Sequence, residues 1–423
     1  MARRSKVARW VKRGSTLLLL MATGTVLLFS QCEQFGAVPS GSHHQRMTES
    51  PNYNPEKDIF VNETPGVIDE MFAHSGFWAN PRKNLTNNFL FNPNTPTPNV
   101  FLPEVRGHLP SDLRDTSDTV KFTWLGHATV LASINEKTIL FDPVFSESAA
   151  PVSWVVKRYQ PPAISIDELP SIDFIVISHD HYDHLDMTTI QSLDDSMFFV
   201  PLGVDEHLKV WNIPSNQIMS FDWYDEANIT EDFQIALTPS QHFSGRDLNR
   251  DATLWGSWVV EIEGHSIYFS GDSGYSEEFI EINDRYGPFD IAICEAGQYN
   301  EAWDQIHMYP EESVQAAIDL NATTLLPIHN TKYILALHEW DDPLERVYQE
   351  GKRTNQHVST PMIGESFNLG EPMEDNPWWR DVAKHNPWFL KTSAIVGWLL
   401  PLIFLAGIGM IVHERFLPQS EEE

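Results

Sequence analysis

The sequence predicts an α/β protein in which two mixed β-sheets pack as a sandwich and helices cover the outside. Two observations support this prediction. Over residues 119–370, short apolar runs alternate with polar turns, as expected for strands. Helical segments are interposed between these runs, so hairpin and crossover connections occur in the same chain, which favours an αββα sandwich. The 423 residues, 42% of them hydrophobic, allow a core of sufficient size.

Nine apolar runs are expected to be strands. They are residues 121–124, 130–134, 138–141, 174–177, 197–200, 234–238, 257–262, 266–269 and 291–294. The clearest helix begins at Pro310, where a proline in the first turn, followed by Glu311 and Glu312, suits the positive end of the helix dipole. A second helix is expected to begin at Asp342 and to run toward Tyr348.

The N-terminal region, residues 1–35, is typical of a signal or an N-terminal membrane anchor. Six basic residues precede an apolar run over residues 17–29, which is the order found in export signals. Cys32 stands where a bacterial lipoprotein would be cleaved and acylated, but Phe29 and Gln31 fit that processing site poorly. Lipidation, an uncleaved anchor and a cleaved signal therefore remain open.

The C-terminal region predicts a transmembrane helix. Residues 393–412 are uncharged and long enough to cross ~30 Å of hydrocarbon as a helix, although a buried core helix is the alternative. A juxtamembrane segment, residues 371–392, precedes this span, and an acidic tail, residues 413–423, follows it. Trp378, Trp379, Trp388 and Trp398 are residues favoured at the membrane interface. We therefore expect a membrane-anchored protein whose middle domain is periplasmic or extracytoplasmic.

Composition limits the partners of the middle domain. Residues 36–118 are rich in Pro, Asn and Gly and are expected to form an extended arm packed on the core. The chain has 59 acidic and 28 basic residues and a formal charge of −31, which disfavours a nucleic-acid partner. Only Cys32 and Cys294 are cysteines, so no disulfide framework is predicted, and Cys294 is expected to be a buried, inert thiol.

A histidine-rich stretch follows the apolar run that ends at Ile177. His179, His181, Asp183 and His184 fall within six residues in an H-x-H-x-D-H pattern. On a tight loop this spacing lets the first two turn toward one cation and the last two toward a neighbouring cation. Imidazole and carboxylate ligands are expected for zinc, although iron or manganese would also accept them. The alternative is a solvated surface turn.

Seven motifs, taken in order, resemble the metallo-β-lactamase superfamily, and within it the branch of the N-acyl-phosphatidylethanolamine-hydrolysing phospholipases D. They are WLGHAT (124–129), LFDPVF (140–145), RYQPP (158–162), HDHYDHLD (179–186), QHFSGR (241–246), GDSGY (271–275) and PIH (327–329). The resemblance covers roughly residues 36–349. The H-x-H-x-D-H pattern alone specifies only the superfamily, whereas the ordered set points to the phospholipase-like branch.

The resemblance implies a site for two metal ions, expected to be zinc. By position, the first ion is held by His179, His181 and His242, the second by Asp183, His184 and His329, and both by Asp272. The residues themselves agree, because the last histidine of each set and the bridging aspartate stand at or just after the end of an apolar run. A sheet edge can aim such residues at a common point, although each alone would more often be an ordinary loop or core residue.

Three further residues are candidates for supporting roles. Asp142, at a strand end, resembles the family's carboxylate that orients metal ligands, although it could also be a plain strand-end aspartate. His127 is a second candidate of this kind. His307, in a stretch that resembles the branch's active-site rim, could assist the leaving group or contact phosphate, or could simply flank a helix. With Asp183 and Asp272, it completes the expected catalytic set. His207 shows no partner pattern, and no role is predicted for it.

The resemblance implies a hydrolase. Two cations sharing a water lower its pKa, and the bridging hydroxide is the expected nucleophile. The implied substrate is the phospholipid N-acyl-phosphatidylethanolamine, cleaved to N-acylethanolamine and phosphatidic acid. Residues 148–156 suit a lid or a lipid-contacting wall, or form a packed loop. The alternatives are a lactone or carboxylic-ester hydrolase acting on another small amphipathic substrate, and a non-catalytic metal-binding membrane sensor or scaffold.

Overall fold

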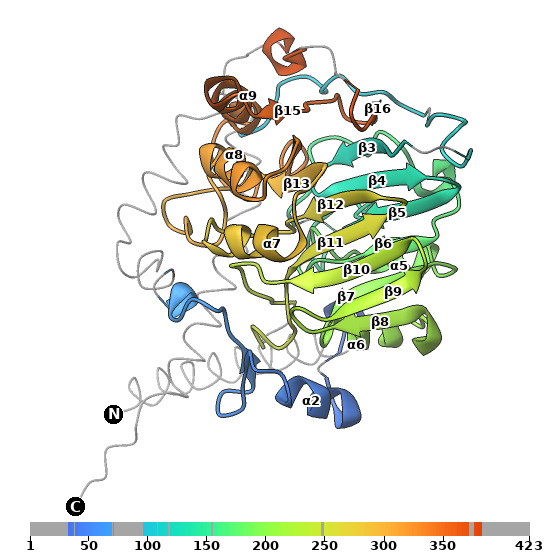
Figure 1. Ribbon diagram of the computed structural model, residues 1–423, viewed down its shortest axis with the longest axis vertical. Coiled ribbons are helices and arrows are strands. Elements are labelled where there is room, and N and C mark those ends of the chain that lie inside the picture. Colours follow the sequence, from blue (N-terminus) through green and yellow to red (C-terminus); the bar gives the residue numbers. More distant parts are fainter. Residues whose placement is uncertain are drawn as a thin grey trace, which may run out of the picture.

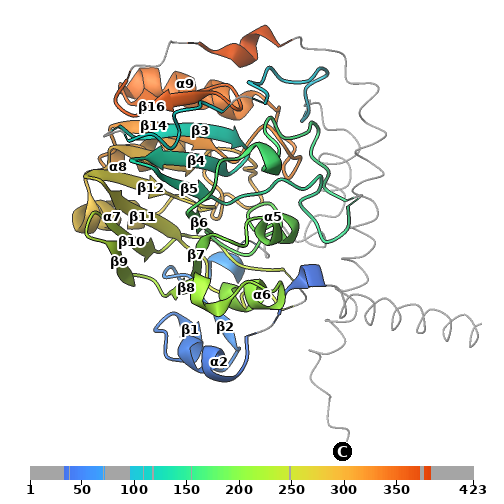
Figure 2. The same cartoon turned by 90° about the vertical axis from the view of Figure 1, so that its right-hand side faces the viewer.

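The computed structural model describes residues 33–382, except residues 38, 70, 72–95, 108, 117–118, 154, 247–248 and 372–375. In this part of the chain, two seven-stranded mixed sheets face each other as a sandwich (Figure 1). Helices α7 and α8 lie outside one sheet, and α5 and α6 lie outside the other (Figure 2). The predicted pair of mixed sheets with helices on the outside is therefore confirmed.

The first sheet has the strand order β16-β3-β4-β5-β6-β7-β8. An antiparallel half consists of β16 (Ser366–Asn368), β3 (Lys121–Gly126), β4 (Thr129–Ile134) and β5 (Lys137–Phe141). A parallel half continues through β6 (Phe174–Val176), β7 (Met197–Pro201) and β8 (Ile218–Phe221). The crossovers of the parallel half contain α5 (Met187–Ser192) and α6 (Val204–Val210).

The second sheet repeats this pattern in the order β15-β14-β13-β12-β11-β10-β9. Its antiparallel half consists of β9 (Glu226–Thr230), β10 (Phe233–Thr238), β11 (Ser257–Ile262) and β12 (His265–Phe269). Its parallel half adds β13 (Ile291–Glu295), β14 (Thr324–Ile328) and β15 (His357–Val358). The intervening helices are α7 (Glu278–Tyr286), α8 (Pro310–Asp319) and α9 (Asp342–Thr354).

Aromatic side chains fill the space between the two sheets. Phe141 of β5 meets Phe269 of β12 with ring centroids 4.9 Å apart, and Phe221 of β8 meets Trp258 of β11 at 5.2 Å. Phe141, Phe269 and Trp258 are 0% exposed, and Phe221 is 2% exposed. Such interdigitation of two inner faces is how stacked sheets form a core. These contacts hold the two sheets against each other.

All nine predicted strands are present, and α9 extends past the predicted Tyr348 to Thr354. Two of the strands that were not predicted, β9 and β14, each lack one of the usual signals of a strand. In β9 the residues alternate between exposed and half-buried positions at the edge of the sheet. In β14 the central Pro327 cannot donate a backbone hydrogen bond, which normally argues against a central strand.

The described part of the arm is attached to the core. Its elements are α2 (Gly41–Thr48), β1 (Tyr53–Asn54) and β2 (Ile59–Phe60). Arg46 of α2 donates hydrogen bonds to the carbonyl oxygen and the hydroxyl of Ser220, both at 2.9 Å. The arm therefore docks on β8, the edge strand of the first sheet.

The terminal segments expected to be membrane-associated fall largely outside the described residues. These are residues 1–32 and 383–423, which include the predicted transmembrane segment 393–412. Among the residues that the structure describes, none of the helices has the length and apolar character needed to cross a bilayer.

The expected interfacial role of two tryptophans is wrong. Trp378 and Trp379 lie in a short 3-10 helix, η5 (Trp378–Asp381), and are 4% and 0% exposed. The Trp379 indole donates to Glu345 of α9 at 2.9 Å and meets the Tyr348 ring edge-on at 5.7 Å. These tryptophans are part of the protein core, because tertiary packing and not lipid surrounds their rings.

Candidate metal centre

Histidine and aspartate side chains gather where strands of both sheets end. His179, His181, Asp183 and His184 occupy the loop between β6 and α5. The other three predicted ligands follow three strands of the second sheet: His242 follows β10, Asp272 follows β12 and His329 follows β14. Six of the seven are buried, and His181 is partly exposed. The structure therefore brings all the predicted ligands together.

The first group consists of His179, His181, His242 and Asp272, whose ligand atoms lie within 4.8 Å of one another. His181 Nδ1 is 2.9 Å from His179 Nε2 and 3.2 Å from His242 Nε2. Asp272 Oδ2 is 3.7 Å from Nε2 of both His179 and His242. Three imidazole nitrogens and one carboxylate thus converge, which is a donor set suited to a four-coordinate zinc ion.

The second group shares Asp272 with the first. Asp272 Oδ2 lies 3.1 Å from His184 Nε2, and its Oδ1 lies 3.3 Å from His329 Nε2. Asp183 Oδ2 lies 3.4 Å and 3.3 Å from the same two nitrogens. The Asp272 carboxylate therefore contacts both groups of imidazoles, as the bridging prediction requires.

The outer ring nitrogens of four of the candidate histidine ligands have acceptors, which fixes the tautomers of these rings. These acceptors are Ser178 Oγ at 2.8 Å for His179, Asp142 Oδ2 at 2.7 Å for His184, the Ile306 carbonyl at 3.1 Å for His242 and Glu295 Oε2 at 3.2 Å for His329. Because the outer nitrogens carry the protons, the inner nitrogens present lone pairs. His184 Nε2 and Asp272 Oδ1 are buried without a hydrogen-bond partner. Such atoms are costly unless a cation takes them up, so the site fits metal ions.

Asp142 lies where its predicted orienting role requires. Besides holding His184, it accepts hydrogen bonds from the backbone N–H of Ser178 at 2.7 Å and from the Ser178 hydroxyl at 2.5 Å. Asp142, His127 and His329 all adopt positive φ angles, of 38°, 54° and 64°. Such conformations are uncommon for non-glycine residues and concentrate at functional sites.

His127 contacts the second group. Its Nε2 lies 2.9 Å from Asp183 Oδ2, and its ring centroid is 4.4 Å from that of His329 and 5.0 Å from that of Tyr333. Burial, together with the neighbouring His329, lowers the pKa of His127 to about 3. The neutral ring therefore donates a hydrogen bond from Nε2–H to Asp183 and orients that carboxylate.

His307 lies beside the candidate ligands and forms a hydrogen bond with Glu295. His307 Nδ1 is 2.7 Å from Glu295 Oε2, and its ring centroid is 5.1 Å from that of His242. The other carboxylate oxygen of Glu295 accepts from the backbone N–H groups of Ser273 at 3.1 Å and Met308 at 2.9 Å. Glu295 was not predicted from the sequence. The available signal was a carboxylate directly after the apolar run 291–294.

Protons and cations compete for this site. Burial disfavours charge on His329, but Asp272, Asp183 and Glu295 outweigh it and raise its pKa to about 10. Burial likewise opposes charge on His184, but Asp272 and Asp183 raise its pKa well above the usual value. A cation that binds these imidazoles must displace their protons, so metal affinity should weaken as the pH falls.

The segment 148–156, for which a lid, a lipid-contacting wall or a packed loop was predicted, is anchored at its base. Ala149 is 8% exposed and packs in a small apolar cluster with Val144 and Tyr333. Arg158, just after this loop, donates to the Val144 carbonyl oxygen at 2.9 Å and to the Tyr333 hydroxyl at 2.6 Å. These contacts fix the base of the loop, and its role as a lid or lipid-contacting wall stays a prediction. Residue 154 lies outside the described part.

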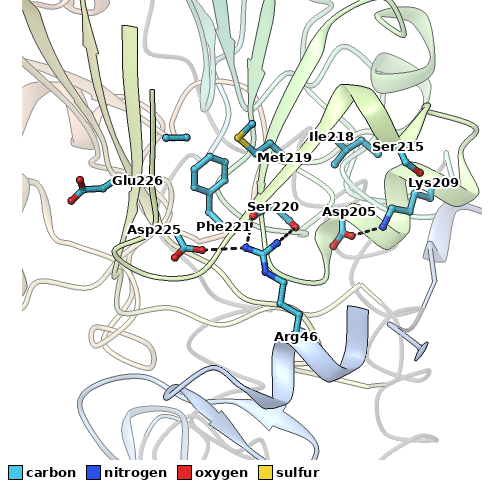
Figure 3. Close-up of a pocket in the computed structure, with 11 residues that line it drawn as sticks. Arg46, Asp205, Lys209, Ser215, Ile218, Met219, Ser220, Phe221, Asp225 and Glu226 are labelled. Carbon is cyan, nitrogen blue, oxygen red and sulfur yellow. Dashed lines mark hydrogen bonds and ion pairs between the residues drawn. The ribbon is translucent and has the colours of Figure 1, made fainter. Parts of the chain in front are cut away.

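A cavity of about 600 Å³ lies away from this centre, bordered by α2, α6, β8 and β9 (Figure 3). In it Arg46 pairs with Asp225 at 3.2 Å, and Lys209 pairs with Asp205 at 2.5 Å. None of the candidate metal ligands lines it. The cavity therefore marks the docking of the arm on the sheet edges and not the candidate metal centre.

Comparison with known proteins agrees with this geometry. Residues 137–330 match the family model described as the beta-lactamase superfamily domain. An uncharacterized protein of Mycobacterium tuberculosis is 39% identical over 64% of this chain and 74% of its own length. The N-acyl-phosphatidylethanolamine-hydrolyzing phospholipase D 1 of Caenorhabditis elegans is 34% identical over 52% of this chain and 65% of its own length.

Among solved structures, Igni18, described as a novel metallo hydrolase from the archaeon Ignicoccus hospitalis, is similar over 60% of this chain and all of its own. The TM-score is 0.49 and the sequence identity is 21%. The sequence relatives establish the family. The chain belongs to the metallo-β-lactamase superfamily of metal-dependent hydrolases, with relatives that include an N-acyl-phosphatidylethanolamine-hydrolysing phospholipase D.

Proposed function

We propose that the protein is a binuclear zinc phosphodiesterase that cleaves N-acyl-phosphatidylethanolamine to N-acylethanolamine and phosphatidic acid. The observation that carries the two-metal part of the proposal is the Asp272 carboxylate, which approaches imidazoles of both groups at 3.1–3.7 Å. The name of the nematode relative supports the substrate class. Iron or manganese would suit the same ligands, so metal analysis decides the element.

The chain's own residues divide the work of the reaction. When bound, two cations activate water at neutral pH and stabilise the negative charge that develops on phosphoryl oxygens. Asp183 and Asp272 would help to hold the cations, because each carboxylate lies 3.1–3.4 Å from Nε2 of both His184 and His329. His307, at the rim with 13% of its side chain exposed, is placed to protonate the departing N-acylethanolamine oxygen. Glu295 accepts from its Nδ1 at 2.7 Å and so fixes its tautomer and orientation.

Product identity tests the proposed reaction. The detergent-purified full-length protein is incubated with N-acyl-phosphatidylethanolamine, and in parallel with a lactone and a carboxylic ester, and the products are identified by mass spectrometry. We expect N-acylethanolamine and phosphatidic acid in equal amounts. Faster turnover of the lactone or ester, with no phosphatidic acid, would establish the acyl hydrolase instead. Metal binding without turnover of any substrate would favour a sensor or scaffold.

His307→Ala should lower turnover by ~10²–10⁴-fold, the usual cost of losing one acid–base group. Both metal ions should remain, since His307 is outside the predicted ligand set. Turnover and metal content are measured on the same preparation, with His357→Ala as a control because His357 is an exposed histidine on the edge strand β15. Loss of metal in the His307 variant would make this residue a ligand and contradict the assigned role.

We further propose that the protein is anchored to a membrane by its terminal segments, as their sequences suggest. Deleting residues 393–412 should release much of the protein from membranes if the N-terminal segment is cleaved without lipidation. Fractionation of this variant, and of a Cys32→Ala variant, identifies the anchoring end. If residues 393–412 fused to a soluble reporter fail to insert into membranes, the proposed span is wrong.

A further inference from the structure

A short segment near the start of the described chain, residues 33–37, is tied to the loop that carries four candidate metal ligands. We call this segment the N-terminal strap. The main chain of Glu33, Gln34 and Ala37 forms one hydrogen bond each with a side chain of the main domain. These three side chains, Trp211, Arg246 and His207, are all 1–4% exposed. The strap is therefore tied to buried side chains by partly buried hydrogen bonds.

One connection passes through His207 and Asp180. Asp180 stands between His179 and His181 and is 3% exposed. Its carboxylate accepts hydrogen bonds from the backbone N–H of Gly245 at 2.8 Å and from His207 Nε2 at 3.3 Å. The other ring nitrogen of His207, Nδ1, accepts from the backbone N–H of Ala37 at 3.0 Å. Because Ala37 occupies the lone pair of Nδ1, the ring proton stays on Nε2, where it holds Asp180.

A second connection passes through Arg246. Its guanidinium donates to the carbonyl oxygens of Asp180 at 2.9 Å and Leu185 at 2.7 Å, which bracket the metal loop. It also donates to the carbonyl oxygen of Gln34 in the strap at 2.7 Å. A buried guanidinium requires acceptors for its donors, and withdrawal of the strap would remove the acceptor of Nε, the Gln34 carbonyl oxygen.

The Arg246 guanidinium is also flanked by rings that connect it with the strap. It lies 4.1 Å from the ring centroid of Tyr182, a residue of the metal loop, and 4.8 Å from that of Trp211. Trp211 in turn donates its indole N–H to the Glu33 carbonyl oxygen at 2.6 Å. The strap thus contacts Arg246 and Trp211, and Arg246 in turn holds the metal loop through its hydrogen bonds to Asp180 and Leu185.

The strap approaches His207 so closely that residue 36 must be glycine. Gly36 has a φ of +71°, and a Cβ atom added there would lie 2.0 Å from His207 Nδ1. Any larger residue would force the strap and His207 apart.

We propose that the N-terminal strap is a positioning element of the metal centre, which holds the loop carrying His179, His181, Asp183 and His184 in its binding geometry. The proposal rests on the proposed metal-dependent function. Displacing the strap should speed metal release by about 10-fold, the lower end of the effect of losing hydrogen-bond partners behind metal ligands. The folded domain should persist, because the strap makes few of the contacts of the core.

Two glycine variants of the full-length protein provide a matched comparison. Gly36→Ala inserts the Cβ that collides with His207, whereas Gly41→Ala also adds a Cβ at a positive φ, +62°, with no atom within 4 Å. The release of zinc into a chromogenic chelator and the visible absorption spectrum of the cobalt-substituted protein are measured well below the melting temperature. We expect about 10-fold faster release and a changed spectrum only for Gly36→Ala. Equal behaviour of the two variants would overturn the proposal.

A pair of His207 variants decides the question if Gly36→Ala does not fold. His207→Gln keeps a donor for Asp180 and an acceptor for Ala37, whereas His207→Phe keeps neither. Faster metal release from the phenylalanine variant, with near-normal release from the glutamine variant, would support the strap's role. Equal release from both would overturn it. A wild-type protein that binds no metal would overturn the proposed function itself and this inference with it.

Discussion

Asp272→Ala should abolish hydrolysis of N-acyl-phosphatidylethanolamine, with a larger loss than the ~10²–10⁴-fold expected for the single acid–base group His307. The reason is that Asp272 approaches candidate ligands of both ions, so its removal disturbs both ions together. Turnover and metal content are measured at a fixed, saturating metal concentration. The wild-type protein should contain close to two equivalents of transition metal, and the variant clearly fewer.

A surface aspartate provides the control for this variant. Asp284→Ala removes an exposed carboxylate from α7 and should leave turnover and metal content unchanged. Circular dichroism verifies that both variants fold. If the Asp272 variant keeps two metal ions and near-normal turnover, the bridging role must be abandoned, even if the H-x-H-x-D-H loop proves to bind zinc.

Withdrawal of metal by a chelator should strongly lower the melting temperature. An ion present at a thousand times its Kd stabilises the folded state by about 4 kcal/mol. For a domain of this size, at about 2–4 °C per kcal/mol, two ions together should account for more than about 10 °C. The effect is expected because the site otherwise leaves buried imidazole and carboxylate atoms without hydrogen-bond partners.

Calorimetry with and without chelator measures this shift, and adding zinc back should restore the original melting temperature. The Asp272→Ala variant serves as the reference, since a protein already depleted of metal should respond little to the chelator. A wild-type melting temperature that is the same with and without chelator would show that the histidine cluster holds no stabilising cation.

The seven candidate ligands could be predicted from the sequence because four of them share a local spacing and the family resemblance implies the other three. The H-x-H-x-D-H spacing concentrates four of them on one loop, and the others stand next to apolar runs that proved to be strands. The convergence of these strand ends at one edge of the sandwich then follows from the topology. The structure shows their proximity, and their ligand role remains a prediction for metal analysis.

The supporting residues were harder to predict because their partners are distant in sequence. Glu295 acquires its role by meeting His307 and His329, and His207 by meeting Asp180 and the backbone N–H of Ala37. No local spacing encodes such contacts.

Trp378 and Trp379 illustrate a further limit of the sequence. Their amphipathic rings suit a membrane interface and a protein core equally well. Only their contacts with Glu345 and Tyr348 of α9 show which environment surrounds them.

The most direct test of the proposed function is hydrolysis of N-acyl-phosphatidylethanolamine in ¹⁸O-labelled water by the zinc-loaded, full-length protein. Attack of water on phosphorus forms a new P–O bond and releases N-acylethanolamine with its original oxygen. We therefore expect one ¹⁸O atom in the phosphatidic acid and none in the N-acylethanolamine. An ¹⁸O label in a free fatty acid, with unlabelled phosphate, would show attack on an acyl carbon and contradict the phosphodiesterase assignment.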